Sequence, residues 1–213
     1  MVSETLILTR PDGVLAIREP ELPPPHRLLV LLHGWGQNEN SLWEFTAGLP
    51  GDYHILAPRG PYFKAEGEYG WRPTIIGRRS RLEENVQPAQ ELVARIDAWA
   101  GENHVDATHF SVLGFSQGAA MIYVLAALFP ERLSRAVVLS GYPPRGLDLS
   151  DKPLKGIPFL VSHGRQDDII DFEEGQKALP MLAAAGAEVT WIEEDISHQV
   201  GPKTRLAIPD FLK

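Results

Sequence analysis

The chain has 213 residues, of which 44% are hydrophobic and 23% charged, a composition typical of a globular domain with a substantial core. Its formal net charge of -8 disfavours nucleic acid and anionic membrane surfaces as partners, because both are negatively charged. The absence of cysteine excludes disulfides, thiolate catalysis and cysteine-bound metals. Neither a secretory signal nor an apolar stretch of roughly 18 residues is visible, so we expect one cytoplasmic domain over residues 1–213, without stable membrane insertion.

Strand-like and helix-like periods alternate along the chain, which predicts an α/β fold with a mostly parallel central sheet and helices on both faces. Residues 5–9 and 14–18 are expected to form an opening hairpin. Residues 27–32 are apolar on both faces, as in a central parallel strand, and residues 53–57 give the next strand. Between them, Ser41-Leu42-Trp43-Glu44 has the form of a capping box and predicts a short helix.

The same alternation continues through the second half of the chain. A long helix is expected with Pro88 near its start and Gly101 near its end. Gly186 would end a later helix, whereas Pro209 disfavours the closing one. The further strands are expected at residues 108–113, 133–139, 157–161 and 187–192, and the further helices at 119–129, 172–185 and 203–212.

The pentapeptide Gly114-Phe115-Ser116-Gln117-Gly118 joins the strand 108–113 to the helix 119–129 and has the sequence of a nucleophile elbow. This sharp turn holds a serine in a strained conformation, so the residues two before and two after it must be small. Ser116 is therefore the candidate nucleophile. A serine hydroxyl is a poor nucleophile at neutral pH and needs a base that a carboxylate orients.

The partners of Ser116 are expected after it, in the order aspartate then histidine, on loops at the carboxyl ends of strands. Only His163 and His198 follow Ser116 in the sequence. His163 precedes the aspartate candidates, whereas His198 comes just after the last predicted strand and is the candidate base. Asp167 and Asp168 both lie in the expected loop, and chemistry alone does not separate them.

A glycine-rich turn, His33-Gly34-Trp35-Gly36-Gln37, follows the buried strand 27–32. Its glycines allow the backbone to direct an N–H toward a developing oxyanion. Together with the residue after the nucleophile, this predicts backbone donors at Trp35 and Gln117. Gln117 also opens a helix, whose dipole favours negative charge.

Two connections bear on access to this site. About sixteen residues, 141–156, separate two strands after the nucleophile helix, too few for a helical lid, so we expect an open site without a lid domain. The longer connection 58–82 carries several aromatic side chains beside glycines. A loop of this length at the site's edge predicts a wall of an acyl or alcohol pocket.

Four motifs carry a family resemblance: Leu31-Leu32-His33-Gly34-x-Gly36, Gly114-Phe115-Ser116-Gln117-Gly118, His163-Gly164-x-x-Asp167 and the late His198. Together they resemble the phospholipase/carboxylesterase family of α/β-hydrolases, from about Arg27 to the C-terminus. The resemblance implies an α/β-hydrolase fold with Ser116 as nucleophile, Asp167 as acid and His198 as base. It also assigns the oxyanion hole to Trp35 and Gln117. The sequence departs from the family at Ser197, usually glycine, and at Asp168, often proline.

The activity that the resemblance implies is that of a serine carboxylesterase, which hydrolyses short to medium acyl esters through an acyl-enzyme without a metal or organic cofactor. The substrate would be a small-molecule ester, and Trp71, Phe115 and Ile170 are expected to contact it. A lysophospholipase or acyl-(protein) thioesterase with the same triad is the alternative. A non-catalytic binding protein of this fold is disfavoured, because all three triad residues are present. Nucleic acid is not an expected partner. The sequence does not decide between a monomer and a homodimer.

Overall fold

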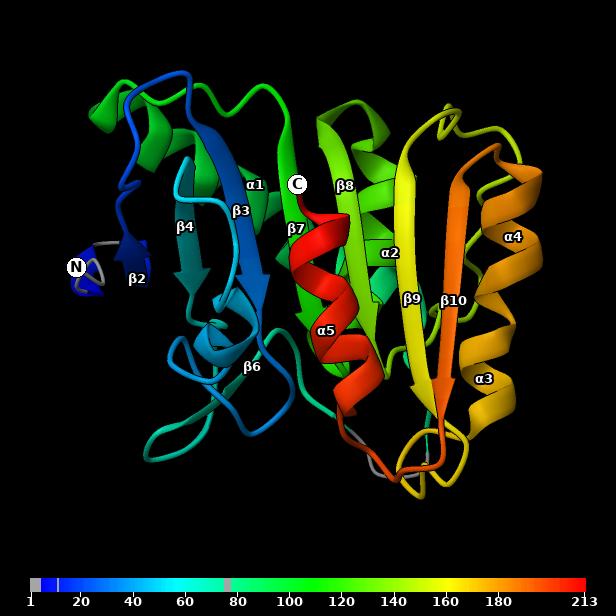
Figure 1. Cartoon of the computed structure of the whole chain (residues 1–213). Coiled ribbons are helices and arrows are strands. Elements are labelled where there is room, and N and C mark those ends of the chain that lie inside the picture. Colours follow the sequence, from blue (N-terminus) through cyan, green and yellow to red (C-terminus); the bar gives the residue numbers. More distant parts are fainter. Residues whose placement is uncertain (1–4, 11, 75–77) are drawn as a thin grey trace.

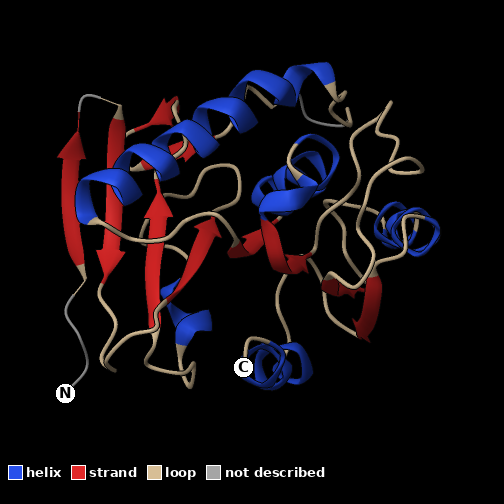
Figure 2. Cartoon of the chain, turned by 90° about the horizontal axis from the view of Figure 1, so that it is seen from above, coloured by secondary structure: helices blue, strands red, loops and turns tan. Residues whose placement is uncertain are grey.

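The computed structural model describes residues 5–10, 12–74 and 78–213, in which one twisted sheet lies between two helical layers (Figure 1 and Figure 2). Its eight strands have the order β1-β2-β4-β3-β7-β8-β9-β10. From β4 to β10 all neighbours are parallel, whereas β1 and β2 form an antiparallel hairpin at one edge. The strands are β1 (Leu6–Arg10), β2 (Gly13–Arg18), β3 (Arg27–Leu32), β4 (Tyr53–Pro58), β7 (Phe110–Phe115), β8 (Leu133–Leu139), β9 (Pro158–Gly164) and β10 (Glu188–Glu194).

Helices cover both faces of the sheet, as the sequence predicted (Figure 2). One face is covered by α1 (Glu83–Asn103), α2 (Gln117–Leu128) and α4 (Ala178–Ala184). The other face is covered by α5 (Pro202–Phe211) and the 3-10 helix η1 (Trp43–Thr46). Short α3 (Phe172–Gln176) precedes α4.

The continuous apolar run of β3 explains how one strand serves both layers. Its side chains alternate, so Leu28, Val30 and Leu32 join the core under α1 and α2. Leu29 and Leu31 join the second core, under α5 and η1. A strand buried on both faces is expected at the centre of a parallel sheet.

Two local predictions are corrected by the structure. Residues 172–185 form two helices rather than one, because Pro180 has no N–H to donate and its ring crowds the carbonyl of Gln176. The Ser41 hydroxyl accepts a hydrogen bond from the Asn38 N–H and caps no helix, so η1 begins at Trp43. Helix α1 runs from Glu83 to Asn103, so Pro88 lies near its start and Gly101 near its end, as predicted, and its C-cap His104 has a positive φ.

The connections at the carboxyl ends of the strands border the candidate active site around Ser116. No helix lies between β8 and β9, a stretch that the structure describes in full, so the absence of a lid in this connection is confirmed. The connection 58–82 contains a hairpin that the sequence analysis missed, β5 (Tyr62–Ala65) and β6 (Glu68–Gly70). Pro11 of the predicted opening hairpin and residues 75–77 of the connection lie outside the described residues. No helix among those described is long and apolar enough to span a bilayer.

Candidate active site

The turn between β7 and α2 holds Ser116 with a φ of 54°, in the left-handed region that a non-glycine residue rarely adopts. The two flanking glycines explain how this turn packs. A Cβ on Gly118 would collide with the carbonyl of Leu32 in β3, and one on Gly114 would meet the backbone of Gly118 at 2.6 Å. The strand and the helix therefore approach more closely than any side chain allows, as the elbow sequence predicted.

Three loops at the carboxyl ends of β7, β9 and β10 bring the candidate residues together; these ends point downward in Figure 1. The Ser116 Oγ lies 2.9 Å from Nε2 of His198, and Nδ1 of His198 lies 2.7 Å from Oδ2 of Asp167. The carboxylate accepts, so Nδ1 carries the proton and Nε2 is free to accept from the serine hydroxyl. Asp168 is exposed, whereas the Asp167 side chain is 0% exposed.

The Asp167 carboxylate is fully hydrogen-bonded. Oδ1 accepts from the N–H groups of Ile169 at 3.0 Å and Ile170 at 2.8 Å, and Oδ2 faces two histidines, His198 at 2.7 Å and His163 at 3.2 Å. Burial acts to raise the pKa of Asp167, but the hydrogen bonds from His163, His198 and Ile170 outweigh it and hold that pKa well below its ordinary range. The carboxylate is therefore ionised and rigidly oriented at neutral pH.

The two predicted oxyanion donors belong to adjoining turns. Trp35 follows β3, and Gln117 is the first residue of α2. Gly70 lets the two approach, because a Cβ there would collide with the Trp35 ring and lie 2.9 Å from Oε1 of Gln117. A helix N-terminus offers unpaired N–H groups and a favourable dipole to an anion. The turn that carries Trp35 therefore lies close to the side chain of Gln117, and the two backbone donors stay a prediction.

The side chain of Gln117 has a role that the sequence analysis missed. Its Oε1 accepts from the Trp71 N–H at 2.7 Å, and its Nε2 donates to the Arg72 carbonyl at 3.0 Å and to Oγ1 of Thr74 at 2.8 Å. These bonds fasten the segment after β6 to the elbow. No local pattern reveals them, because the partners lie more than forty residues away in the sequence.

His33 fixes the turn that carries Trp35. Its Nε2 accepts from the Gly60 N–H at 2.9 Å, so Nδ1 carries the proton and donates to the Gly34 carbonyl at 2.8 Å. The ring lies 5.2 Å from that of Trp71, whose indole N–H donates to the His33 carbonyl. Burial lowers the pKa of His33 from its ordinary 6.5 to about 4. The imidazole is therefore neutral and rigidly held at pH 7.

We expect acid to destabilise the protein through His33. The unfolded chain binds this proton below about pH 6.5 but the folded chain only below about pH 4, so the free energy of unfolding should fall as pH falls between these values. The loss attributable to this group is about 3 kcal/mol. Urea unfolding of the wild type and His33→Gln across this window measures it. Equal pH slopes for the two proteins would contradict the prediction.

The three residues predicted to contact the substrate, Phe115, Ile170 and Trp71, lie in three different surroundings. The Phe115 ring lies 4.9 Å from the His198 ring, beside the candidate nucleophile. Ile170 is buried in a small cluster with Ala120 and Tyr142. Trp71 is 2% exposed and packs in the core, where its indole N–H donates to the His33 carbonyl. Its contact with a substrate stays a prediction.

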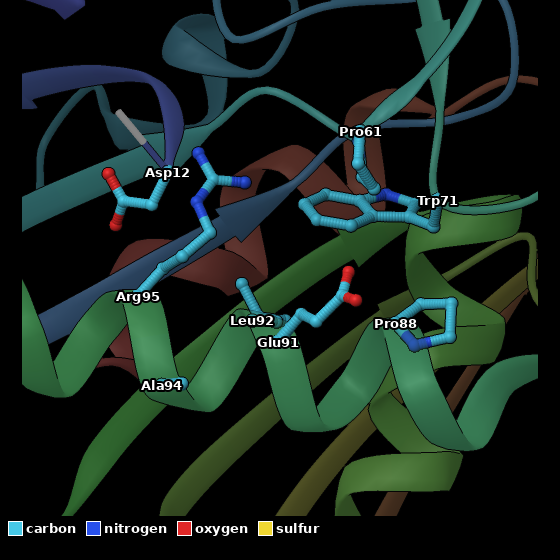
Figure 3. Close-up of a pocket in the computed structure, with 8 residues that line it drawn as sticks. All are labelled: Asp12, Pro61, Trp71, Pro88, Glu91, Leu92, Ala94 and Arg95. Carbon is cyan, nitrogen blue, oxygen red and sulfur yellow. The ribbon is translucent and has the colours of Figure 1, made fainter. Parts of the chain in front are cut away.

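A separate hollow of about 300 Å³ lies between α1 and Trp71, and no residue of the Ser116–His198–Asp167 chain lines it (Figure 3). Its lining residues are Asp12, Pro61, Trp71, Pro88, Glu91, Leu92, Ala94 and Arg95. Among all the residues that the structure describes, no group of three or more histidine, aspartate or glutamate side chains is arranged to hold a metal ion.

The parallel sheet, the elbow and the hydrogen-bond chain at the carboxyl ends of the strands together define an α/β-hydrolase. The family model described as Phospholipase/Carboxylesterase matches residues 13–213, and the chain belongs to this family. It is therefore a hydrolase that acts on ester bonds. The family resemblance inferred from the four motifs is confirmed.

Individual relatives agree with this membership. The chain is 26% identical to Esterase YpfH of Escherichia coli (strain K12) over 204 residues, 89% of this chain and 83% of the relative. It is 34% identical to Acyl-protein thioesterase 1 of Emericella nidulans over 100 residues, 42% of this chain and 40% of the relative. The crystal structure of the Bacillus cereus carboxylesterase matches with a TM-score of 0.82 at 23% identity and covers 92% of each chain. This structural likeness confirms the predicted fold.

Proposed function

We propose that this chain is a serine carboxylesterase that hydrolyses short to medium acyl esters of small molecules through an acyl-enzyme. The observation that carries the proposal is the hydrogen-bond chain from Ser116 through His198 to Asp167. A serine, a histidine and a buried carboxylate in this order are the groups that nucleophilic acyl transfer requires. The proposal extends to a single cytoplasmic domain over residues 1–213.

The proposed reaction uses these three groups and the two predicted backbone donors. As Ser116 Oγ attacks the ester carbonyl, its proton passes to Nε2 of His198, and Asp167 stabilises the imidazolium that forms. The oxyanion accepts hydrogen bonds from the backbone N–H groups of Trp35 and Gln117. His198 then gives its proton to the leaving alcohol, and a water molecule, deprotonated by the same nitrogen, releases the acid from Ser116.

The surroundings of Ser116 favour dissolved esters as substrates. The connection between β8 and β9 forms no helix and thus no lid, so the site needs no lipid interface to open it. Apolar side chains lie around the site. The Phe115 ring packs against the His198 ring, and Ile170 packs with Ala120 and Tyr142 in a small buried cluster. These surfaces suit an acyl chain of limited length, because each methylene left in water forfeits about 0.8 kcal/mol, about fourfold in binding.

An acyl-(protein) thioesterase is the second candidate, favoured by the partial match to a relative of that name. The same groups would carry out the reaction, since a thioester carbonyl is attacked in the same way. A lysophospholipase would use them too. The three activities differ only in the substrate, so a substrate panel separates them.

We expect steady activity on dissolved acyl esters and no rate jump when the substrate passes its solubility limit. A lid-bearing lipase shows such a jump, because the interface opens its site. Rates on p-nitrophenyl esters of graded chain length, measured through the emulsion threshold, test this. A long-chain acyl thioester and a lysophospholipid serve as comparison substrates. A sharp rise at the threshold, or activity confined to long-chain triglyceride or lysophospholipid, would contradict the proposal.

A further inference from the structure

A second histidine contacts the carboxylate of the candidate triad. His163 lies near the end of β9, and its side chain is 0% exposed. Its Nε2 lies 3.2 Å from Oδ2 of Asp167 and 2.9 Å from the carbonyl oxygen of Ile170. That Oδ2 is the same oxygen that accepts from Nδ1 of His198 at 2.7 Å. Two imidazoles therefore converge on one carboxylate oxygen.

The contacts of the His163 ring indicate where its proton lies. Both neighbours of Nε2 are acceptors, so Nε2 carries the proton and shares it between the Ile170 carbonyl and Asp167. Nδ1 is buried and has no hydrogen-bond partner among the residues that the structure describes. A proton on Nδ1 would be an unsatisfied buried donor, which is unfavourable. The contacts thus favour a ring that donates toward the carboxylate.

We propose that His163 is a positioning residue for the reaction: by donating to Oδ2 of Asp167 it fixes the carboxylate in the plane that orients His198. This inference rests on the proposed function, in which His198 is the base. The N–H groups of Ile169 and Ile170 hold Oδ1, and the His163 ring donates to Oδ2, the oxygen that His198 also contacts. Without it, the carboxylate could rotate about its side-chain torsions, and the imidazole of His198 would tilt away from Ser116.

The packing around His163 keeps the ring in one orientation. The Phe172 ring meets it edge-on at 6.1 Å between centroids. Gly175 of α3 lies directly against it, since a Cβ there would collide with Nδ1 of His163. The glycine at this position therefore leaves the space that the ring needs. A histidine that served only to fill the core would need no hydrogen bond to Asp167. The His163 ring instead contacts Oδ2 of Asp167, the oxygen that also accepts from His198.

The test compares His163→Leu, which removes the donor but fills the space, with His163→Gln, whose side-chain amide can donate from the position of Nε2. We expect the leucine variant to lower kcat about tenfold to a hundredfold with KM within twofold of wild type, as for other groups that orient a reacting residue. The glutamine variant should recover most of the loss. Equal losses in both variants, or an unchanged kcat in the leucine variant, would overturn the positioning role.

A second pair of variants tests the ring without replacing it. Gly175→Ala places a Cβ against Nδ1 of His163 and should lower kcat, again without a comparable change in KM. Gly101→Ala is the matched control, because Gly101 is an exposed position of α1 and a Cβ there would meet no atom within 4 Å. If His163→Leu does not fold, this pair and the glutamine variant decide. An unchanged kcat in Gly175→Ala would then contradict the inference.

Ser116→Ala separates the two possible failures. If that variant keeps wild-type turnover, the proposed function is wrong, whatever the His163 variants do. If Ser116→Ala is inactive while folded His163→Leu hydrolyses ester at the wild-type rate, only the positioning role is wrong.

Discussion

Replacement of Ser116 by alanine should abolish ester hydrolysis and labelling by a fluorophosphonate probe. The hydroxyl is the atom that His198 contacts at 2.9 Å, and no other group in the elbow replaces it. Loss of a triad nucleophile typically lowers kcat by several orders of magnitude, so we expect a decrease of at least about 1,000-fold. Residual catalysis would come from the oxyanion donors and substrate binding.

The fold should survive this change. The elbow depends on the glycines at 114 and 118 and on the backbone of residue 116, not on its hydroxyl. Circular dichroism and thermal unfolding check this, and Ser150→Ala, an exposed serine in the connection between β8 and β9, is the matched control. More than a tenth of wild-type turnover in Ser116→Ala would show that another residue is the nucleophile.

The second large effect separates the two adjacent aspartates. Asp167→Asn should lower kcat by about 1,000- to 10,000-fold, because an amide donor facing Nδ1 favours the wrong tautomer of His198. With the proton on Nε2, the imidazole can no longer accept from Ser116. The side chain of Asp168 is exposed, so Asp168→Asn should change kcat only a few-fold.

Steady-state kinetics on one soluble ester, with both variants at the same pH, measures this difference. The variants are a matched pair, since each replaces one carboxylate by an amide in the same loop. Thermal unfolding shows whether Asp167→Asn stays folded; its amide oxygen can still accept from the N–H groups of Ile169 and Ile170. The reverse order of effects would assign the acid to Asp168.

The sequence by itself determined the α/β class, the eight strands of the central sheet and the elbow. These features depend on local patterns: the apolar run of β3, the spacing of Gly114 and Gly118 around Ser116, and the order of residues along the chain. Each is a property of neighbours in sequence, because strand burial and a tight turn impose their requirements on successive residues. The candidate nucleophile and base were therefore found without the structure.

Local patterns failed where a long-range contact or a single proline decided the outcome. The expected helix 172–185 is interrupted because Pro180 removes a donor, and the serine of the expected capping box bonds Asn38 instead. No local pattern showed that Trp71 would be buried with its indole N–H donating to the His33 carbonyl, 38 residues away.

The chemistry of the residues did not separate the neighbours Asp167 and Asp168, and the family resemblance favoured Asp167; the tertiary structure places the carboxylate of Asp167 against His198. It also placed His163 on that same carboxylate, although its position along the chain excluded it as the base. The physical reason is that a hydrogen bond depends on the direction of a side chain and on groups that the fold brings near. Chain order tells which loops meet at the edge of a parallel sheet, but only the packed loop determines which of its side chains points inward.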